Sequence, residues 1–139
     1  MLINKVLGTV VAGVALAAVL PMGTAQAATC KGQSCTGQNP KTAGCGEDAK
    51  VIDRVRPGGG GPEVELRSSA TCGAAWARIE KADPSWKFKI EYKGGKPQFA
   101  NASYTFEAYT RMVWNSYSYR ACVEMYDGQG GNYTCTKWH

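Results

Sequence analysis

The sequence predicts a mainly β fold: a small antiparallel β-sandwich or partly open barrel, stapled by disulfides, with an irregular Cys-rich segment at its N-terminus. Three observations predict it. The chain has six cysteines in 139 residues. Polar and apolar residues alternate over residues 63–67 and 87–93. Beyond residue 27 the only leucine is Leu66, and Val, Ile, Thr, Tyr and Trp supply the apolar side chains, which favours strands over helices.

The first 27 residues have the pattern of a cleavable signal peptide. Lys5 precedes an apolar run over residues 6–20, and Ala25-Gln26-Ala27 is a small-x-small sequence of the kind that signal peptidase accepts. An uncleaved membrane anchor is disfavoured, because spanning a bilayer takes about 20 consecutive apolar residues. We therefore expect cleavage after Ala27. The product is a single secreted, extracellular domain over residues 28–139 with no membrane span, made of a Cys/Gly-rich segment (28–50) and a β core (51–139).

All six cysteines lie in the expected mature chain. An even number of cysteines in a short exported chain is typical of a disulfide framework. Zinc is the competing interpretation, but no CxxC pair exists and the only histidine is His139. The sequence therefore predicts three disulfides, no metal and no cofactor.

Several further strands and turns follow from local pattern. Residues 51–55 are a strand, and residues 74–81 fit a strand slightly better than a short helix. The Gly- and Pro-rich residues 57–62 predict a surface loop. Gly94 and Gly95 predict a tight hairpin turn with positive φ, which would place Pro97 on a sheet edge.

A second hairpin is predicted near the end of the chain. Residues 120–126 and 132–138 flank a turn at 127–131, and folding about its midpoint sets Cys122 opposite Cys135. The same register pairs Glu124 with Tyr133 and Arg120 with Lys137. It makes the cysteine face polar, and it turns three side chains inward: Ala121, Val123 and Met125.

Candidate binding residues are basic or aromatic. The formal net charge is +5, and +4 without Lys5, which is too weak for a nucleic-acid signature. Lys87, Lys89 and Lys93 share one strand face and Lys96 follows the turn, so together they could meet an anionic partner; alternatively, they protect an exposed edge strand from unwanted pairing. Aromatic residues are dense near the end of the chain, and they serve either a binding surface or the core. Those singled out for partner binding are Trp114, Tyr117 and Tyr119.

No catalytic residue is assigned. His139 stands at the end of the sequence, where we expect disorder and where no sequence feature gives it a partner. Cysteines held in disulfides offer no thiolate nucleophile. Paired carboxylates are the remaining acid–base candidates, although solvated polar faces explain them as well: Glu63 with Glu65, and Glu47, Asp48 and Asp53.

The spacing of several segments resembles the actinobacterial domain-of-unknown-function family 2690. The segments that carry the resemblance are residues 30–40, 42–45, 48–49, 64–69 and 71–79, with a weaker match at 109–113. Asn39 and Ser68 depart from the residues expected there, and the Cys122/Cys135 hairpin is an addition. The resemblance implies export and a framework of four cysteines, since members occur as small exported proteins or as outward-facing ends of membrane-tethered regulators. It implies no activity.

Six cysteines allow fifteen pairings. Hairpin symmetry pairs Cys122 with Cys135, and the other four form the set that the resemblance implies. Within that set we expect Cys30 with Cys35, which closes a short loop, and Cys45 with Cys72, which ties the weak N-terminal segment to the β core.

The function expected from these residues is that of a secreted, non-catalytic interaction module. It would be a subunit or adaptor of an exported assembly, or a binder of cell-surface material. Its partner would be another exported protein or cell-wall material rather than nucleic acid, and its oligomeric state is left open. An inhibitor of a secreted hydrolase such as a protease is the second hypothesis, and a small extracellular enzyme is the third.

Overall fold

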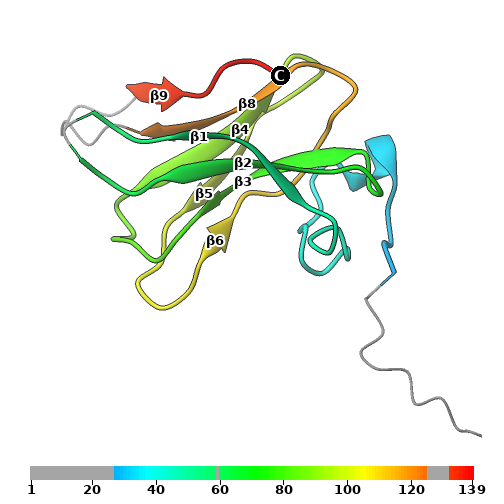
Figure 1. Cartoon of the computed structure of the whole chain (residues 1–139), viewed down its shortest axis with the longest axis horizontal. Helices are drawn as coiled ribbons and strands as arrows, with labels where there is room; N and C mark the ends of the chain where they lie inside the picture. Colours follow the sequence, from blue (N-terminus) through cyan, green and yellow to red (C-terminus); the bar gives the residue numbers. More distant parts are fainter. Residues whose placement is uncertain (1–26, 59, 125–131) are drawn as a thin grey trace, which may run out of the picture.

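The computed structural model describes residues 27–58, 60–124 and 132–139 and consists of two antiparallel sheets packed face to face (Figure 1). The first sheet has the order β1 (Lys50–Val55), β2 (Val64–Ser69), β3 (Ala74–Ile79) and β6 (Ala108–Tyr109), with β7 (Val113–Trp114) also paired to β3. The second has the order β5 (Gln98–Asn101), β4 (Lys87–Tyr92), β8 (Tyr119–Glu124) and β9 (Tyr133–Cys135). The predicted mainly β, disulfide-stapled fold is confirmed.

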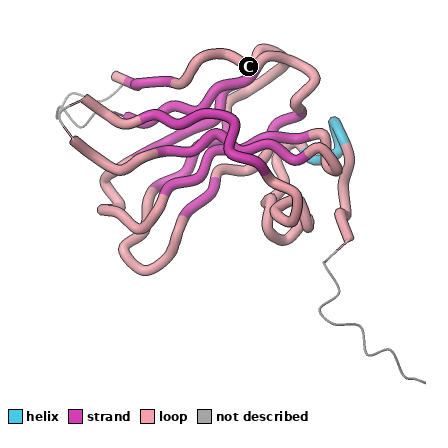
Figure 2. The backbone as a smooth tube through the Cα atoms, viewed as in Figure 1, coloured by secondary structure: helices cyan, strands magenta, loops and turns pink. Residues whose placement is uncertain are grey.

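Helix is nearly absent from the part of the chain that the structure describes. Its one helical turn is the 3₁₀ helix η1 (Gly32–Cys35) in the Cys-rich segment (Figure 2). Within the described residues, no helix has the length and the apolar character that crossing a membrane requires. The expected signal peptide lies outside the described residues except for Ala27.

The core between the sheets follows the alternation seen in the sequence. Val64 and Leu66 of β2 face Phe88 and Ile90 of β4 across the sandwich, and all four side chains are fully buried. Alternate residues of β8 complete this core as predicted: Ala121 and Val123. Met125 and the turn at 127–131 lie outside the described residues.

The stretch at 74–81, for which the sequence left strand and helix open, forms the strand β3. All six of its residues are buried, because it is covered on both faces. Ala75, Ala77 and Ile79 join the core between the sheets, whereas Ala74 and Trp76 face the other way. The small alanines allow this close approach from both sides.

The Cys-rich segment covers the outward face of the first sheet. Around Trp76 it forms a second core whose buried members are Cys30, Cys35, Ala43, Cys45, Cys72, Ala74, Trp76 and Met112. Gly37 donates a backbone hydrogen bond to Met112, and Met112 donates one to Gln38, each 2.9 Å long. The disulfides are Cys30–Cys35, Cys45–Cys72 and Cys122–Cys135, the same pairs that we expected. With few large apolar residues of its own, the segment is held by two of these bonds and by the sheet beneath it.

Asp48 is a polar anchor for the same segment. Its carboxylate accepts hydrogen bonds from the Ser69 hydroxyl (2.6 Å) and from the Thr71 amide and hydroxyl (2.9 Å each). The bond from Ser69 is the main cause that lowers the pKa of Asp48 below 3.8, burial opposes it, and the bonds from Thr71 add to it. The ionised carboxylate therefore ties the Cys-rich segment to the turn between β2 and β3.

Asp48→Asn should remove part of the acid sensitivity of the fold. A depressed pKa contributes stability that is present above the unfolded value of 3.8 and is lost as the pH falls through the folded value. Urea unfolding at pH 7 should show a loss of about 1 kcal/mol for the variant, and the difference from the parent should shrink towards pH 2–3. Glu47→Gln is the control, because it removes an exposed neighbouring carboxylate. Between pH 7 and pH 2–3, its free energy of unfolding should fall by as much as that of the parent. A constant difference at all pH values would refute the role of the charge.

The hairpin between β4 and β5 confirms the predicted pairing but corrects two details. Gly94 and Gly95 have no positive φ; they are needed because a Cβ at Gly94 would lie 2.4 Å from the Tyr117 ring, and one at Gly95 would lie 2.4 Å from the Tyr92 hydroxyl. Strand β4 is also not an edge strand, because it lies between β5 and β8. Edge protection therefore does not explain Lys87 and Lys89. On this side of the sheet the edge strand is β5, which Pro97 immediately precedes.

The β8–β9 pair keeps the predicted register only in part. Cys122 pairs with Cys135 and Glu124 with Tyr133, as predicted. The expected partner of Arg120, Lys137, is displaced, because Tyr119 and His139 exchange both backbone hydrogen bonds (3.0 and 2.9 Å). One extra residue is accommodated after Thr136, whose hydroxyl accepts a hydrogen bond from the Ala121 amide (3.2 Å). This shift brings the last residues alongside the start of β8.

Candidate functional site

The outward face of the second sheet collects basic and aromatic side chains from four segments of the chain. The register places Lys89 beside Phe99 of β5 on one side and beside Cys122 of β8 on the other. Glu91 lies beside Arg120 in the same way. Together with side chains that contact this row, these residues form what we call the basic aromatic face: Lys87, Lys89, Lys93, Phe99, Arg120, Tyr133 and Trp138.

Each cation of this face lies over an aromatic ring. Lys87 Nζ and Lys89 Nζ are 4.9 and 5.7 Å from the centre of the Phe99 ring. Lys89 Nζ is also 4.0 Å from the centre of the Tyr133 ring. Lys93 Nζ and Arg120 Cζ are 5.0 and 4.4 Å from the centre of the Trp138 ring. Such contacts are attractive because the ring face is electron-rich, and here they hold the rings beside the cations.

Glu91 fixes the centre of the face. Its carboxylate forms ion pairs with Lys89 (2.5 Å) and with Arg120 (2.9 Å). Burial raises the pKa of Glu91, but the hydrogen bonds and charges of Lys89 and Arg120 outweigh this effect and hold that pKa below its usual value. Burial, with the charges of Glu124 and Glu91, raises the pKa of Tyr133.

Two cations of the face are not neutralised by a carboxylate of the described residues, so their charge is available to a binding partner. Among the described residues, neither Lys87 nor Lys93 forms an ion pair, and their contacts are with Phe99 and Trp138. The two rings are themselves accessible, since Phe99 is 49% exposed and Trp138 is 37% exposed. The face therefore offers free positive charge next to open apolar rings on a hydrogen-bonded sheet.

Comparison with known proteins identifies the family. The family model described as "Protein of unknown function (DUF2690)" matches residues 33–123, about two thirds of the chain. The chain belongs to the DUF2690 family. No curated protein and no solved structure matches it.

The DUF2690 match covers only part of the basic aromatic face. Lys87, Lys89, Phe99 and Arg120 lie inside the matched residues, whereas Tyr133 and Trp138 lie beyond them. Cys30 and Cys135 also lie outside the match, although their disulfide partners lie within it. The family description assigns no activity, so an argument about function has to rest on the arrangement of side chains.

The other aromatic candidates in this DUF2690 protein lie elsewhere. Tyr119 is 8% exposed and belongs to the core between the sheets, which removes it from any binding surface. Trp114 and Tyr117 form an edge-to-face pair with 5.9 Å between the ring centres. Tyr117 forms another with Tyr92, with 6.5 Å between the ring centres. Lys96 lies exposed in the turn between β4 and β5.

Four members of the face were not among the sequence candidates: Phe99, Arg120, Tyr133 and Trp138. The hairpin pattern contained a signal for Phe99, because pairing β4 with β5 across Gly94 and Gly95 places it beside Lys89. Arg120 and Tyr133 follow from the Cys122–Cys135 register. The sequence contained no signal that would place Trp138 on this face, because its position depends on the one-residue shift in pairing after Thr136.

Four of the five candidate carboxylates, Glu63, Glu65, Asp48 and Asp53, have structural partners, and so does the histidine. Glu63 pairs with Arg54 and Arg56, and Glu65 pairs with Arg67 and Arg78. The expectation that His139 is disordered and without a partner is wrong: its Nε2 atom lies 2.9 Å from the Asp53 carboxylate. That hydrogen bond is the main cause that lowers the pKa of Asp53. The continued pairing with Tyr119 holds His139 in place, so that it links the second sheet to β1.

Proposed function

We propose that the protein is a secreted, non-catalytic interaction module that binds an anionic glycan of the cell surface through the basic aromatic face. Three disulfides are consistent with an extracellular location. The observation that carries the proposal is the pairing of cations without ion-pair partners with exposed rings. Lys87 and Lys93 supply charge for sulfate, phosphate or carboxylate groups, and Phe99 and Trp138 supply flat apolar surfaces for the C–H faces of sugar rings.

The same geometry favours a glycan over an acidic protein. The centre of a protein–protein interface is depleted of charged residues. Here the centre of the face is an ionic cluster, in which Glu91 joins Lys89 and Arg120. An extended polymer that lies across the sheet can use the rings and the outer lysines without desolvating that cluster.

The proposal predicts a surface-specific loss of glycan binding. The parent protein should bind dextran sulfate and hyaluronan but not neutral dextran, as measured by biolayer interferometry. Lys87→Glu with Lys93→Glu should weaken binding about tenfold or more, because it replaces attraction with repulsion. Phe99→Ala with Trp138→Ala should weaken binding several-fold at unchanged net charge.

Lys50→Glu with Lys81→Glu is the matched control, because it makes the same charge change at exposed lysines outside the face. It should change the affinity by less than about twofold. Equal losses in this control would show that binding follows net charge and not the face. Binding of poly-glutamate in preference to both anionic glycans would instead indicate an acidic protein partner.

A further inference from the structure

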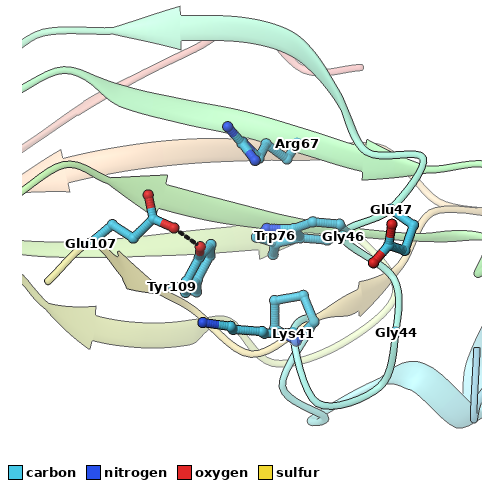
Figure 3. Close-up of a pocket in the computed structure, with 9 residues that line it drawn as sticks. Lys41, Gly44, Gly46, Glu47, Arg67, Trp76, Glu107 and Tyr109 are labelled. Carbon is cyan, nitrogen blue, oxygen red and sulfur yellow. Dashed lines mark hydrogen bonds between the residues drawn. The ribbon is translucent and has the colours of Figure 1, made fainter. Parts of the chain in front are cut away.

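A pocket of about 180 Å³ lies between the Cys-rich segment and the outward face of the first sheet (Figure 3). This is the opposite side of the sandwich from the basic aromatic face. A cavity of roughly 150 Å³ is already large enough to hold a benzene-sized molecule. The side chains that matter for its chemistry are Lys41, Glu47, Arg67, Trp76, Glu107 and Tyr109.

Trp76 presents a buried hydrogen-bond donor. The side chain is 1% exposed, and its indole Nε1 has no hydrogen-bond acceptor in the part of the chain that the structure describes. The nitrogen edge of the ring faces the side of the pocket that is bounded by Tyr109 and Glu107 (Figure 3). Buried indole N–H groups normally find a partner, so an orphaned one next to a pocket indicates an acceptor that enters from outside the chain.

The charged groups around the pocket are balanced and partly engaged. Glu107 accepts hydrogen bonds from the Tyr109 hydroxyl and from Arg78. Arg67 donates to Glu65 through Nε (3.0 Å). Two cations, Lys41 and Arg67, therefore line the pocket against two carboxylates, Glu47 and Glu107. A neutral ligand is favoured, because an ion of either sign would meet as much repulsion as attraction.

The remaining free groups define what such a ligand must carry. Trp76 Nε1 needs an acceptor, and the exposed carboxylate of Glu47, at the other end of the indole, can take a donor (Figure 3). A secondary amide has both in fixed geometry, a carbonyl oxygen and an N–H. Because Nε1 is covered by its neighbours, the entering carbonyl requires a neighbouring side chain to shift.

We propose that this pocket binds a secondary amide group, with the carbonyl oxygen accepting a hydrogen bond from Trp76 Nε1. Two sources share this chemistry, the acetamido group of an N-acetylated amino sugar and a peptide bond. The site is separate from the basic aromatic face, so the outcome for one does not decide the outcome for the other.

The indole N–H gives a direct readout of this contact by ¹H–¹⁵N NMR. The four tryptophans give four indole signals, and Trp76→Phe identifies the one from Trp76. The probes are N-acetylglucosamine and N-acetylalanine methylamide, with glucose and acetate as controls, each added to roughly 100 mM because single-group ligands bind in the millimolar range. The Trp76 signal should move saturably with an amide probe, and not with glucose or acetate. A response to only one of the two amides identifies the source.

A second variant tests amide binding without relying on the correct folding of Trp76→Phe. Glu47→Gln alters an exposed residue of the pocket and should weaken amide binding several-fold, whereas Glu63→Gln, outside the pocket, should not. An unmoved Trp76 signal with both amides would overturn the proposal. So would an equal response to glucose, which would assign the site to hydroxyl groups, or a response to acetate, which would assign it to anions.

Discussion

Phe88→Ala should lower the free energy of unfolding by about 3–5 kcal/mol. Phe88 is fully buried between the sheets and is paired with Ala100 on one side and Val123 on the other. Both neighbours are too small to fill the space that the ring leaves, so a cavity remains and the contacts across the sandwich are lost. Urea unfolding followed by tryptophan fluorescence measures the change.

Phe99→Ala is the matched control for this substitution. It removes the same side chain from the neighbouring strand, but Phe99 faces outward and is 49% exposed. Its loss should cost less than about 1 kcal/mol, mostly from the contacts with Lys87 and Lys89. Similar losses for the two variants would contradict the assignment of the inward and outward faces of the second sheet.

Replacing Cys45 and Cys72 together by Ala should be the most costly of the three disulfide removals. Its two cysteines are 27 positions apart in the sequence, against 13 for Cys122–Cys135 and 5 for Cys30–Cys35, so the closed loops contain 28, 14 and 6 residues. If the main effect is on the entropy of the unfolded chain, the three losses are about 3.6, 3.0 and 2.2 kcal/mol in that order. The Cys45–Cys72 bond also fastens the Cys-rich segment over Trp76, so its removal should expose the second core.

The other two disulfide variants serve as controls, each measured by urea unfolding at the same pH. In the Cys122→Ala, Cys135→Ala variant the remaining bonds should still form, which peptide mapping can check. A Cys45–Cys72 variant that is as stable as the Cys30–Cys35 variant would contradict the ranking. It would indicate that packing on β3, and not the covalent link, holds the Cys-rich segment.

Much of the fold follows from local pattern in the sequence. Alternation over residues 63–67 and 87–93 placed β2 and β4 with the correct inward residues, because one face of each strand is buried and a one-residue slip would expose it. Strand β3 was ambiguous because it is buried on both faces and therefore shows no alternation. The Cys-rich segment covers the outward face of β3. It is attached there by the Cys45–Cys72 disulfide, a long-range bond that local sequence pattern does not predict.

The two candidate surfaces differ in how far the sequence predicts them. Lys87 and Lys89 could be placed on one face from a single strand, whereas Trp138 reaches that face only through the irregular pairing after Thr136. The pocket was not predicted at all. Lys41, Trp76 and Glu107 come from three separate segments, and only the packing of the Cys-rich segment on the first sheet brings them together.

The cysteines of the Cys-rich segment and Cys72 lie closer together than their pairing requires. Their four sulfur atoms are all within 4.8 Å of one another, and Cys30 Sγ is 3.9 Å from Cys45 Sγ although these two are not bonded. During oxidative folding, distance alone therefore does not select the native partners. A thiolate generated at Cys30 has a neighbouring disulfide within reach of exchange. A bond that first closes between the wrong pair can thus be reshuffled inside the collapsed segment, without the sheets having to separate.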